Sequence, residues 1–258
     1  MESLWEGILK PPLAGRNQKP RSTGITMLID KGLSPAETGN LLEMSAAFID
    51  FIKLTFGTAA LYQSDALTRK LELAVENGVA IYPGGTFFEI AYWQNKAELY
   101  FLKLRELGFK WVEISDGTIP LTLSERCKVI EVAFRAGLKV ITEAGKKNPN
   151  LQPDEQSLIE TINNDLKMGV SWVIIEARES GKGIGIFDNQ GGVIEEKFNR
   201  LNQSVPQEKL IWEAPLKQQQ VRLINQFGPN VNLGNIPPAE ALALEALRLG
   251  FRSDTWKV

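Results

Sequence analysis

The feature that most constrains the fold is an eightfold alternation between short apolar segments and longer segments with helical periodicity. The short segments have the composition of buried strands and span residues 24–29, 51–54, 79–82, 111–115, 139–143, 171–176, 210–213 and 230–233. Each is followed by a predicted helix, at residues 35–47, 65–77, 94–107, 123–136, 153–168, 193–202, 217–227 and 238–249. Strands that alternate with helices in this way indicate an α/β fold with a parallel sheet.

Such a series of units can form either an open doubly wound sheet or a closed barrel. An open sheet that binds dinucleotides would carry Gly-x-Gly-x-x-Gly after its first strand, but the turn over residues 30–34 holds a single glycine, Gly32. A length of 258 residues suits one barrel domain. We therefore predict a (β/α)8 TIM barrel over residues 24–258. Residues 1–23 form a short N-terminal extension, which we expect to pack across the barrel bottom or against a neighbouring subunit.

The composition argues against several classes of function. The net charge is −2, whereas binding to the phosphate backbone of nucleic acids needs a concentrated basic face. No apolar stretch approaches the roughly 20 residues of a membrane span, and residues 1–23 lack the apolar core of a signal peptide. Cys127 is the single cysteine, so no disulfide forms within the chain. We therefore expect a cytoplasmic protein that binds neither nucleic acids nor membranes.

The charged residues at the predicted strand ends indicate the position of the active site. The chain contains no histidine, so acid–base chemistry falls to glutamate, lysine and arginine. Active sites of (β/α)8 barrels lie at the C-terminal ends of the strands, where a charged residue between apolar neighbours points into the barrel mouth. Five residues hold such positions: Lys53, Glu113, Glu143, Glu176 and Glu213. Their convergence predicts a polar site for a small anionic substrate.

Buried carboxylates that converge on one mouth need cations among them, because they otherwise raise one another's pKa. The chain supplies four basic residues near these strand ends: Lys53, Lys146, Lys147 and Arg178. A site of carboxylate oxygens also suits Mg²⁺ better than zinc, and the candidate ligands are Glu113, Glu143 and Glu176. The alternative is an internal network of salt bridges that holds no metal.

Three loops carry further candidate residues. Lys146 and Lys147 follow the fifth predicted strand; Lys146 is our preferred proton donor, whereas Lys147 is either an alternative donor or simply solvated. Arg178 can hold a phosphate or a carboxylate with both sides of its guanidinium. The glycine-rich loop over residues 179–185 either cradles an anion, closes as a lid or merely connects two elements. Residues 232–237 lie where barrels often bind phosphate on backbone N–H groups.

Both ends of the chain suggest contacts with another subunit. The extension over residues 1–23 contains Lys19 and Arg21, which we interpret as surface anchors rather than site residues. Phe251 and Trp256 lie close to the C-terminus, where large aromatic side chains usually need something to bury against. We therefore expect a homo-oligomer.

Eight segments, distributed over nearly the whole chain, carry a family resemblance. They include Pro-Gly-Gly-Thr-Phe-Phe-Glu at 83–89, Thr-Glu-Ala-Gly-Lys-Lys at 142–147 and Ile-Ile-Glu-Ala-Arg-Glu-Ser-Gly-Lys-Gly at 174–183. The others span residues 19–32, 51–58, 112–119, 212–215 and 231–236. Together they resemble the phosphosulfolactate synthase family, including its plant heat-stress-associated branch. The resemblance implies a barrel that adds sulfite to phosphoenolpyruvate with Mg²⁺, giving 2-phospho-3-sulfolactate on one route to coenzyme M biosynthesis.

That reaction is consistent with the residues present, because sulfite is its own nucleophile and needs no activated serine, cysteine or histidine. Position and resemblance together favour Lys146 as the proton donor, with Lys53 and Lys147 as alternatives. Mg²⁺ held by one of the three candidate glutamates would stabilise the enediolate-like intermediate. The residues expected to bind substrate are Arg178, Asn232, Asn235, Ser115 and Glu213.

Two other functions remain open at this point. The first is a non-catalytic relative that acts in stress protection through protein contacts and keeps the same barrel. The second is another phosphate-handling barrel, such as an aldolase that forms a Schiff base on Lys146 or Lys53.

Overall fold

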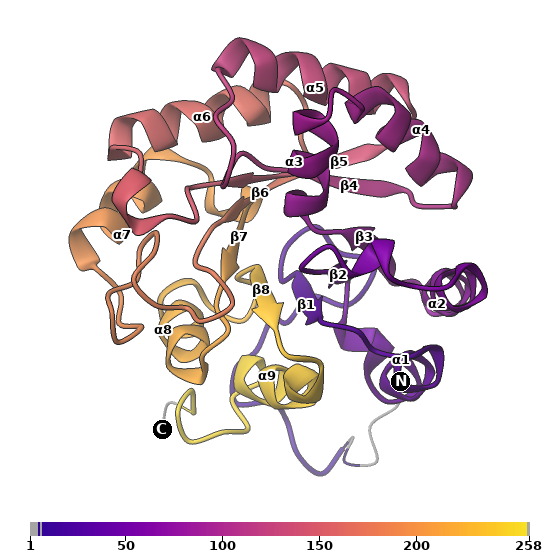
Figure 1. The fold of residues 1–258 in the computed structure, drawn as a ribbon. Coiled ribbons are helices and arrows are strands. Elements are labelled where there is room, and N and C mark those ends of the chain that lie inside the picture. The colour runs from indigo at the N-terminus through magenta and orange to yellow at the C-terminus, as the bar shows by residue number, and fades with distance from the viewer. Residues whose placement is uncertain (1–4, 6, 257–258) are drawn as a thin grey trace.

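Eight parallel strands form a ring surrounded by helices in the computed structural model, which describes residues 5 and 7–256 (Figure 1). The strands are β1 (Thr26–Asp30), β2 (Phe51–Leu54), β3 (Ala80–Pro83), β4 (Trp111–Ile114), β5 (Lys139–Ala144), β6 (Trp172–Ile175), β7 (Leu210–Glu213) and β8 (Leu233–Ile236). Their hydrogen-bonded order is β3-β2-β1-β8-β7-β6-β5-β4, so the first and last strands of the chain are neighbours. The predicted (β/α)8 barrel is confirmed.

Nine α-helices are present in the described part of the chain. They are α1 (Pro35–Ser45), α2 (Ser64–Glu76), α3 (Gly85–Trp93), α4 (Ala97–Glu106), α5 (Leu123–Arg135), α6 (Glu155–Lys167), α7 (Glu195–Ser204), α8 (Lys217–Phe227) and α9 (Ala241–Arg248). Short 3-10 helices lie at Ala46–Phe48, Thr58–Ala60, Pro149–Leu151, Gln207–Lys209 and Pro238–Glu240. Capping boxes fix the starts of two helices, with Ser34 and Glu37 at α1 and Thr122 and Glu125 at α5. None of the helices in the described residues is long and apolar enough to cross a membrane.

The sequence did not predict helix α3. It begins two residues after β3, at Gly85, and residues 94–96 separate it from α4. The segment from Phe87 to Trp93 is rich in aromatic residues, which form helices less readily than alanine or leucine. It also shows little separation into polar and apolar faces, which is the signal that identifies a surface helix. α3 packs against β4 (Figure 1), so this unpredicted helix brings side chains to the barrel mouth.

The last strand lies three residues later than predicted, at Leu233–Ile236 instead of 230–233. Gly234 and Asn235, which are poor strand formers, occupy its middle, so the sequence pattern did not indicate a strand there. Asn232 therefore lies at the start of β8, at the opposite end from the mouth. Its side chain accepts a hydrogen bond from Ile25 N at 3.0 Å and donates one to Leu210 O at 2.8 Å. Asn232 thus joins the lower ends of β1, β7 and β8, and the structure does not place it where we expected a phosphate.

The barrel interior has an apolar floor below a charged mouth. Residues that face inward are two positions apart along a strand, and on five strands an apolar or aromatic residue precedes a charged one by that spacing. The pairs are Phe51 with Lys53, Trp111 with Glu113, Ile141 with Glu143, Ile174 with Glu176 and Ile211 with Glu213. The alternating side chains between them face the helices and form the larger core. The charged layer is therefore shielded from solvent on its lower side.

The segment before β1 packs against the bottom of the barrel. Arg16 forms a bidentate pair with Glu245 of α9, at 2.9 and 3.0 Å, and also donates to Gly24 O. Arg21 pairs with Asp50 just before β2, at 2.8 Å. These contacts are almost completely buried, so they join the extension to the barrel.

Replacing Arg16 tests how strongly the extension is joined to the barrel. Arg16→Met should lower the free energy of unfolding by about 3–5 kcal/mol, because it leaves the buried Glu245 carboxylate without its partner. The matched control is Arg69→Met, which removes a half-exposed pair with Glu72 and should cost about 1 kcal/mol or less. Urea unfolding curves measure both; equal losses in the two variants would contradict a buried, structural role for Arg16.

Candidate active site

A pocket of about 520 Å³, including its open mouth, lies at the C-terminal ends of the strands. Most of the residues predicted for the site line it: Lys53, Glu113, Glu143, Lys147, Glu176, Arg178, Glu213 and Asn235. They come from different strands and strand-following loops, as the barrel geometry dictates. Glycine and threonine residues from the start of α3 complete one side of the wall.

Lys53 lies at the base of the pocket among three glutamates. Its Nζ is 3.0 Å from Glu113 Oε1, 3.0 Å from Glu143 Oε2 and 3.3 Å from Glu213 Oε1. Burial by itself would lower the pKa of Lys53, but the three carboxylates outweigh it and raise this pKa well above its ordinary value. Lys53 is therefore a permanent cation that holds the ends of β2, β4, β5 and β7 together.

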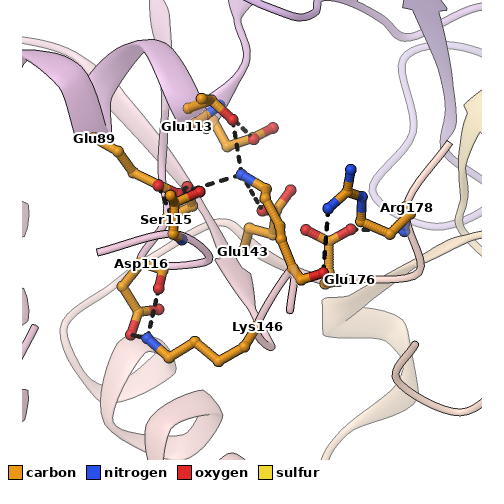
Figure 2. Close-up of polar contacts among 12 residues, drawn as sticks. Glu89, Glu113, Ser115, Asp116, Glu143, Lys146, Glu176 and Arg178 are labelled. Carbon is orange, nitrogen blue, oxygen red and sulfur yellow. Dashed lines mark hydrogen bonds and ion pairs between the residues drawn. The ribbon is translucent and has the colours of Figure 1, made fainter. Parts of the chain in front are cut away.

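The buried carboxyl groups differ sharply in their affinity for protons. Burial raises the pKa of Glu113 to about 7, although Lys53 partly opposes it. The pKa of Glu143 is lowered instead, because Lys53 and Lys147 outweigh the effect of its burial. Burial and the neighbouring carboxylates of Glu143 and Glu213 raise the pKa of Glu176 well above its ordinary value. The pocket therefore places Glu143, which gives up its proton readily, beside Glu176, which holds its proton to a higher pH (Figure 2).

Lys147 is the second ammonium group of the pocket. Its Nζ donates to Thr86 Oγ1 at 2.8 Å and to Glu89 Oε1 at 3.3 Å, and it lies 3.6 Å from Glu143 Oε1. Burial lowers the pKa of Lys147, but Glu143 and Glu89 outweigh this and leave it raised. Thr86 and Glu89 both belong to α3, so the sequence did not identify them as site residues. The signal that could have identified them is the segment at 83–89, which forms part of the family resemblance.

Arg178 lies at the rim, on the loop that follows β6. Its φ of 63° is in the left-handed region, which costs free energy for a residue other than glycine. Its backbone N–H donates to Glu176 Oε1 at 2.6 Å, and its Nη1 donates to Lys147 O at 3.2 Å. The next residue, Glu179, pairs with Lys31 at 2.8 Å across the mouth. These contacts hold the guanidinium beside the pocket opening.

Three residues predicted for the site lie outside the pocket lining. Lys146 points to Asp116, whose Oδ2 is 2.6 Å from its Nζ (Figure 2), because successive residues of the loop project in different directions. Ser115 is buried and donates its hydroxyl hydrogen to Glu89, so it supports the wall from behind. Asn232 lies at the opposite end of the barrel, as described above. Of the two adjacent lysines, only Lys147 lines the pocket.

The carboxylates of the pocket can be compared with the needs of a magnesium ion. No group of three or more acidic, histidine or cysteine residues in the described part of the chain is arranged to hold a metal, so Glu113, Glu143 and Glu176 do not form a preassembled triad. Mg²⁺ usually takes one or two carboxylates and completes its shell with water and substrate oxygens. Glu113 Oε2, Glu143 Oε1 and Glu176 Oε2 are buried oxygens that accept no hydrogen bond. Two such carboxyl groups are enough for a magnesium ion shared with a bound substrate.

Comparison with known proteins agrees with this geometry. A family model described as (2R)-phospho-3-sulfolactate synthase (ComA) matches residues 14–254. Phosphosulfolactate synthase of Methanothermobacter thermautotrophicus is 46% identical over 252 residues, which are 96% of each chain. That of Methanocaldococcus jannaschii is 44% identical over 237 residues, which are 90% of this chain and 94% of the relative.

Solved structures with little sequence similarity share the fold alone. 3-Hexulose-6-phosphate synthase from Salmonella typhimurium has a TM-score of 0.56 and 10% identity, with 90% of this chain and 93% of that chain covered. The match of the family model and of the two relatives extends over most of the chain at far higher identity. The chain therefore belongs to the phosphosulfolactate synthase family of enzymes.

Proposed function

We propose that this chain is a lyase that adds sulfite to phosphoenolpyruvate and forms (2R)-2-phospho-3-sulfolactate. The observation that carries the proposal is that Lys147 and Arg178 bring two cations to one small cavity, while Lys53 offsets the charge of the glutamates at its base. Both substrates are anions, so a cavity with several cations suits them. The family membership supports the same reaction.

The reaction needs a proton donor and a way to hold developing negative charge. The sulfur of sulfite forms a bond to the terminal carbon of phosphoenolpyruvate, and the electron pair of the double bond moves toward the carboxylate. The adjacent carbon then takes one proton, so one C–S bond and one C–H bond replace the C=C π bond. The phosphate ester stays intact throughout. The protein supplies that proton and the cations around the intermediate.

We assign the proton to Lys147. Its ammonium group lines the pocket and is kept protonated by the carboxylates beside it. Lys53 is a poorer candidate because three glutamates surround its Nζ, and Lys146 is bonded to Asp116 outside the lining. We assign anion binding to Arg178 and Asn235, since both line the pocket and both side chains carry N–H groups that can donate to an anion.

Glu143 and Glu176 are the residues that we propose for Mg²⁺. An ion bound there would stabilise negative charge on the substrate carboxylate. Glu213 contributes differently, because it accepts from Ala177 N at 2.9 Å and pairs with Lys53. It thereby holds the start of the β6 loop, which carries Arg178.

We also propose a homo-oligomeric, cytoplasmic enzyme. Phe251 and Trp256 are 53% and 57% exposed, and such aromatic side chains near a chain end suit contact with another subunit. The single thiol, Cys127, suits a reducing compartment.

Turnover of the two substrates tests the proposed reaction directly. Purified protein with sulfite, phosphoenolpyruvate and Mg²⁺ should consume both substrates in equal amounts and give one phosphorylated product, followed by ³¹P NMR. A chelator should reduce the rate, and added Mg²⁺ should restore it. Absence of turnover at any substrate concentration would favour the non-catalytic alternative, and a lysine adduct trapped by borohydride would favour the aldolase.

Paired lysine variants distinguish the two candidate donors. Lys147→Met should lower kcat by about 100-fold or more, the usual contribution of a general acid, with smaller changes in KM. Lys146→Met removes the adjacent charge outside the pocket lining and should retain most of the kcat. Steady-state kinetics measure both variants, and the reverse pattern would move the assignment to Lys146.

The raised pKa of Glu113 predicts how stability depends on pH. Between its ordinary pKa near 4.5 and its folded pKa of about 7, the folded protein binds more protons than the unfolded chain, so the contribution of Glu113 to stability falls as pH rises. Glutamine does not titrate, so Glu113→Gln lacks this pH-dependent loss of stability. The Tm of the variant minus the Tm of the native protein should therefore increase from pH 4.5 to pH 8. Glu196→Gln on α7, an exposed site, should show no such trend in calorimetry. A constant difference for Glu113→Gln would refute the raised pKa.

A further inference from the structure

Lys147 packs against the loop that follows β4. The backbone N–H of Lys147 donates to Gly117 O at 3.0 Å. A Cβ atom added at Gly117 would lie 3.0 Å from Lys147 Cε and 3.1 Å from its Cγ, closer than ordinary packing. The absence of a side chain at Gly117 therefore provides the space along which the lysine extends into the pocket.

Two side chains of α3 hold the far end of the lysine. Thr86 and Glu89 are three residues apart, so they lie on one face of the helix, and both accept a hydrogen bond from Lys147 Nζ. Glu89 is itself held in place, because it is 2% exposed and accepts from Ser115 Oγ and from Thr118 N. The carboxylate that receives the ammonium therefore has little freedom to move.

These contacts leave the ammonium group with one remaining direction. A lysine ammonium has three N–H donors, and Thr86 and Glu89 take two of them. The third remains for the pocket side, where Glu143 Oε1 lies at 3.6 Å. α3 thus fixes both the position of Nζ and the direction of its free N–H bond.

We infer that Thr86 and Glu89 are positioning residues, which hold Lys147 in the orientation needed to protonate the substrate carbon. The inference rests on the proposed role of Lys147 as the proton donor. Neither residue needs to transfer a proton itself. A donor displaced by about 1 Å from its productive position can lose about 100-fold in rate, so loss of either contact acts mainly on the chemical step.

The first test compares kinetic constants of variants at Thr86. Thr86→Val keeps the shape of the side chain but removes the acceptor, and it should lower kcat by about 10-fold to 100-fold with KM for both substrates within about threefold. Thr86→Ser keeps the hydroxyl and should restore most of the kcat. Thr68→Val, at an exposed position on α2, is the control and should match the native enzyme. Native kcat in Thr86→Val, or a loss confined to KM, would overturn the inference.

The second test measures the accessibility of Lys147 and does not depend on catalytic activity. Acetic anhydride acetylates lysines according to their accessibility, and tandem mass spectrometry of the peptide that contains both lysines resolves Lys147 from Lys146. Thr86→Val and Glu89→Gln should increase the acetylation rate of Lys147 several-fold and leave Lys146 unchanged, since Lys146 is bonded to Asp116. Unchanged acetylation of Lys147 in both variants would overturn the positioning role. If acetylation changes as expected but the native protein shows no turnover, the proposed reaction fails and the contact between α3 and Lys147 stands.

Discussion

The mouth of the barrel depends on the buried ammonium group of Lys53. Four glutamates converge there from β4, β5, β6 and β7, and three of them lie within 3.3 Å of this one cation. Without it, like charges in a medium that screens them poorly would repel one another strongly. With it, the carboxyl groups divide into an ionised Glu143 and more basic partners, Glu113 and Glu176. The electrostatic character of the pocket therefore starts from one ammonium group that three carboxylates surround.

The two sides of the pocket are built in different ways. Most of the wall consists of strand ends and of the loops that follow them. The side near β3 and β4 is formed instead by α3, which begins with Gly85 and brings Thr86 and Glu89 against Lys147. A short helix can present backbone N–H groups and side chains to the same small space, which a strand end does less easily. This accounts for the concentration of small and polar residues at the start of α3.

The sequence was sufficient for those features that follow from strict periodicity. The alternation along β2, β4, β5 and β7 identified Lys53 and the converging glutamates, because a side chain two residues after a buried one must face the same way. Loop residues obey no such rule, so the choice between Lys146 and Lys147 depended on contacts with Asp116 and α3 that no local pattern encodes. Asn232 was placed at the wrong end because the strand containing Gly234 and Asn235 does not have the composition of a strand. Long-range contacts, rather than local propensity, decided each of these cases.

Glu113 has a further consequence, because it also closes the wall of the barrel. β3 and β4 stand at the two ends of the hydrogen-bonded strand order, and Gly85 N–H, just beyond β3, reaches Glu113 Oε1 on β4 at 2.6 Å. The Glu113 side chain thus helps to close the barrel between β3 and β4, whereas main-chain hydrogen bonds join the other neighbouring strands. Since the pKa of Glu113 is about 7, protonation of this carboxyl group changes both its hydrogen bond to Gly85 and the charge of the pocket. The contact that closes the barrel between β3 and β4 and the electrostatics of the pocket therefore respond together to pH.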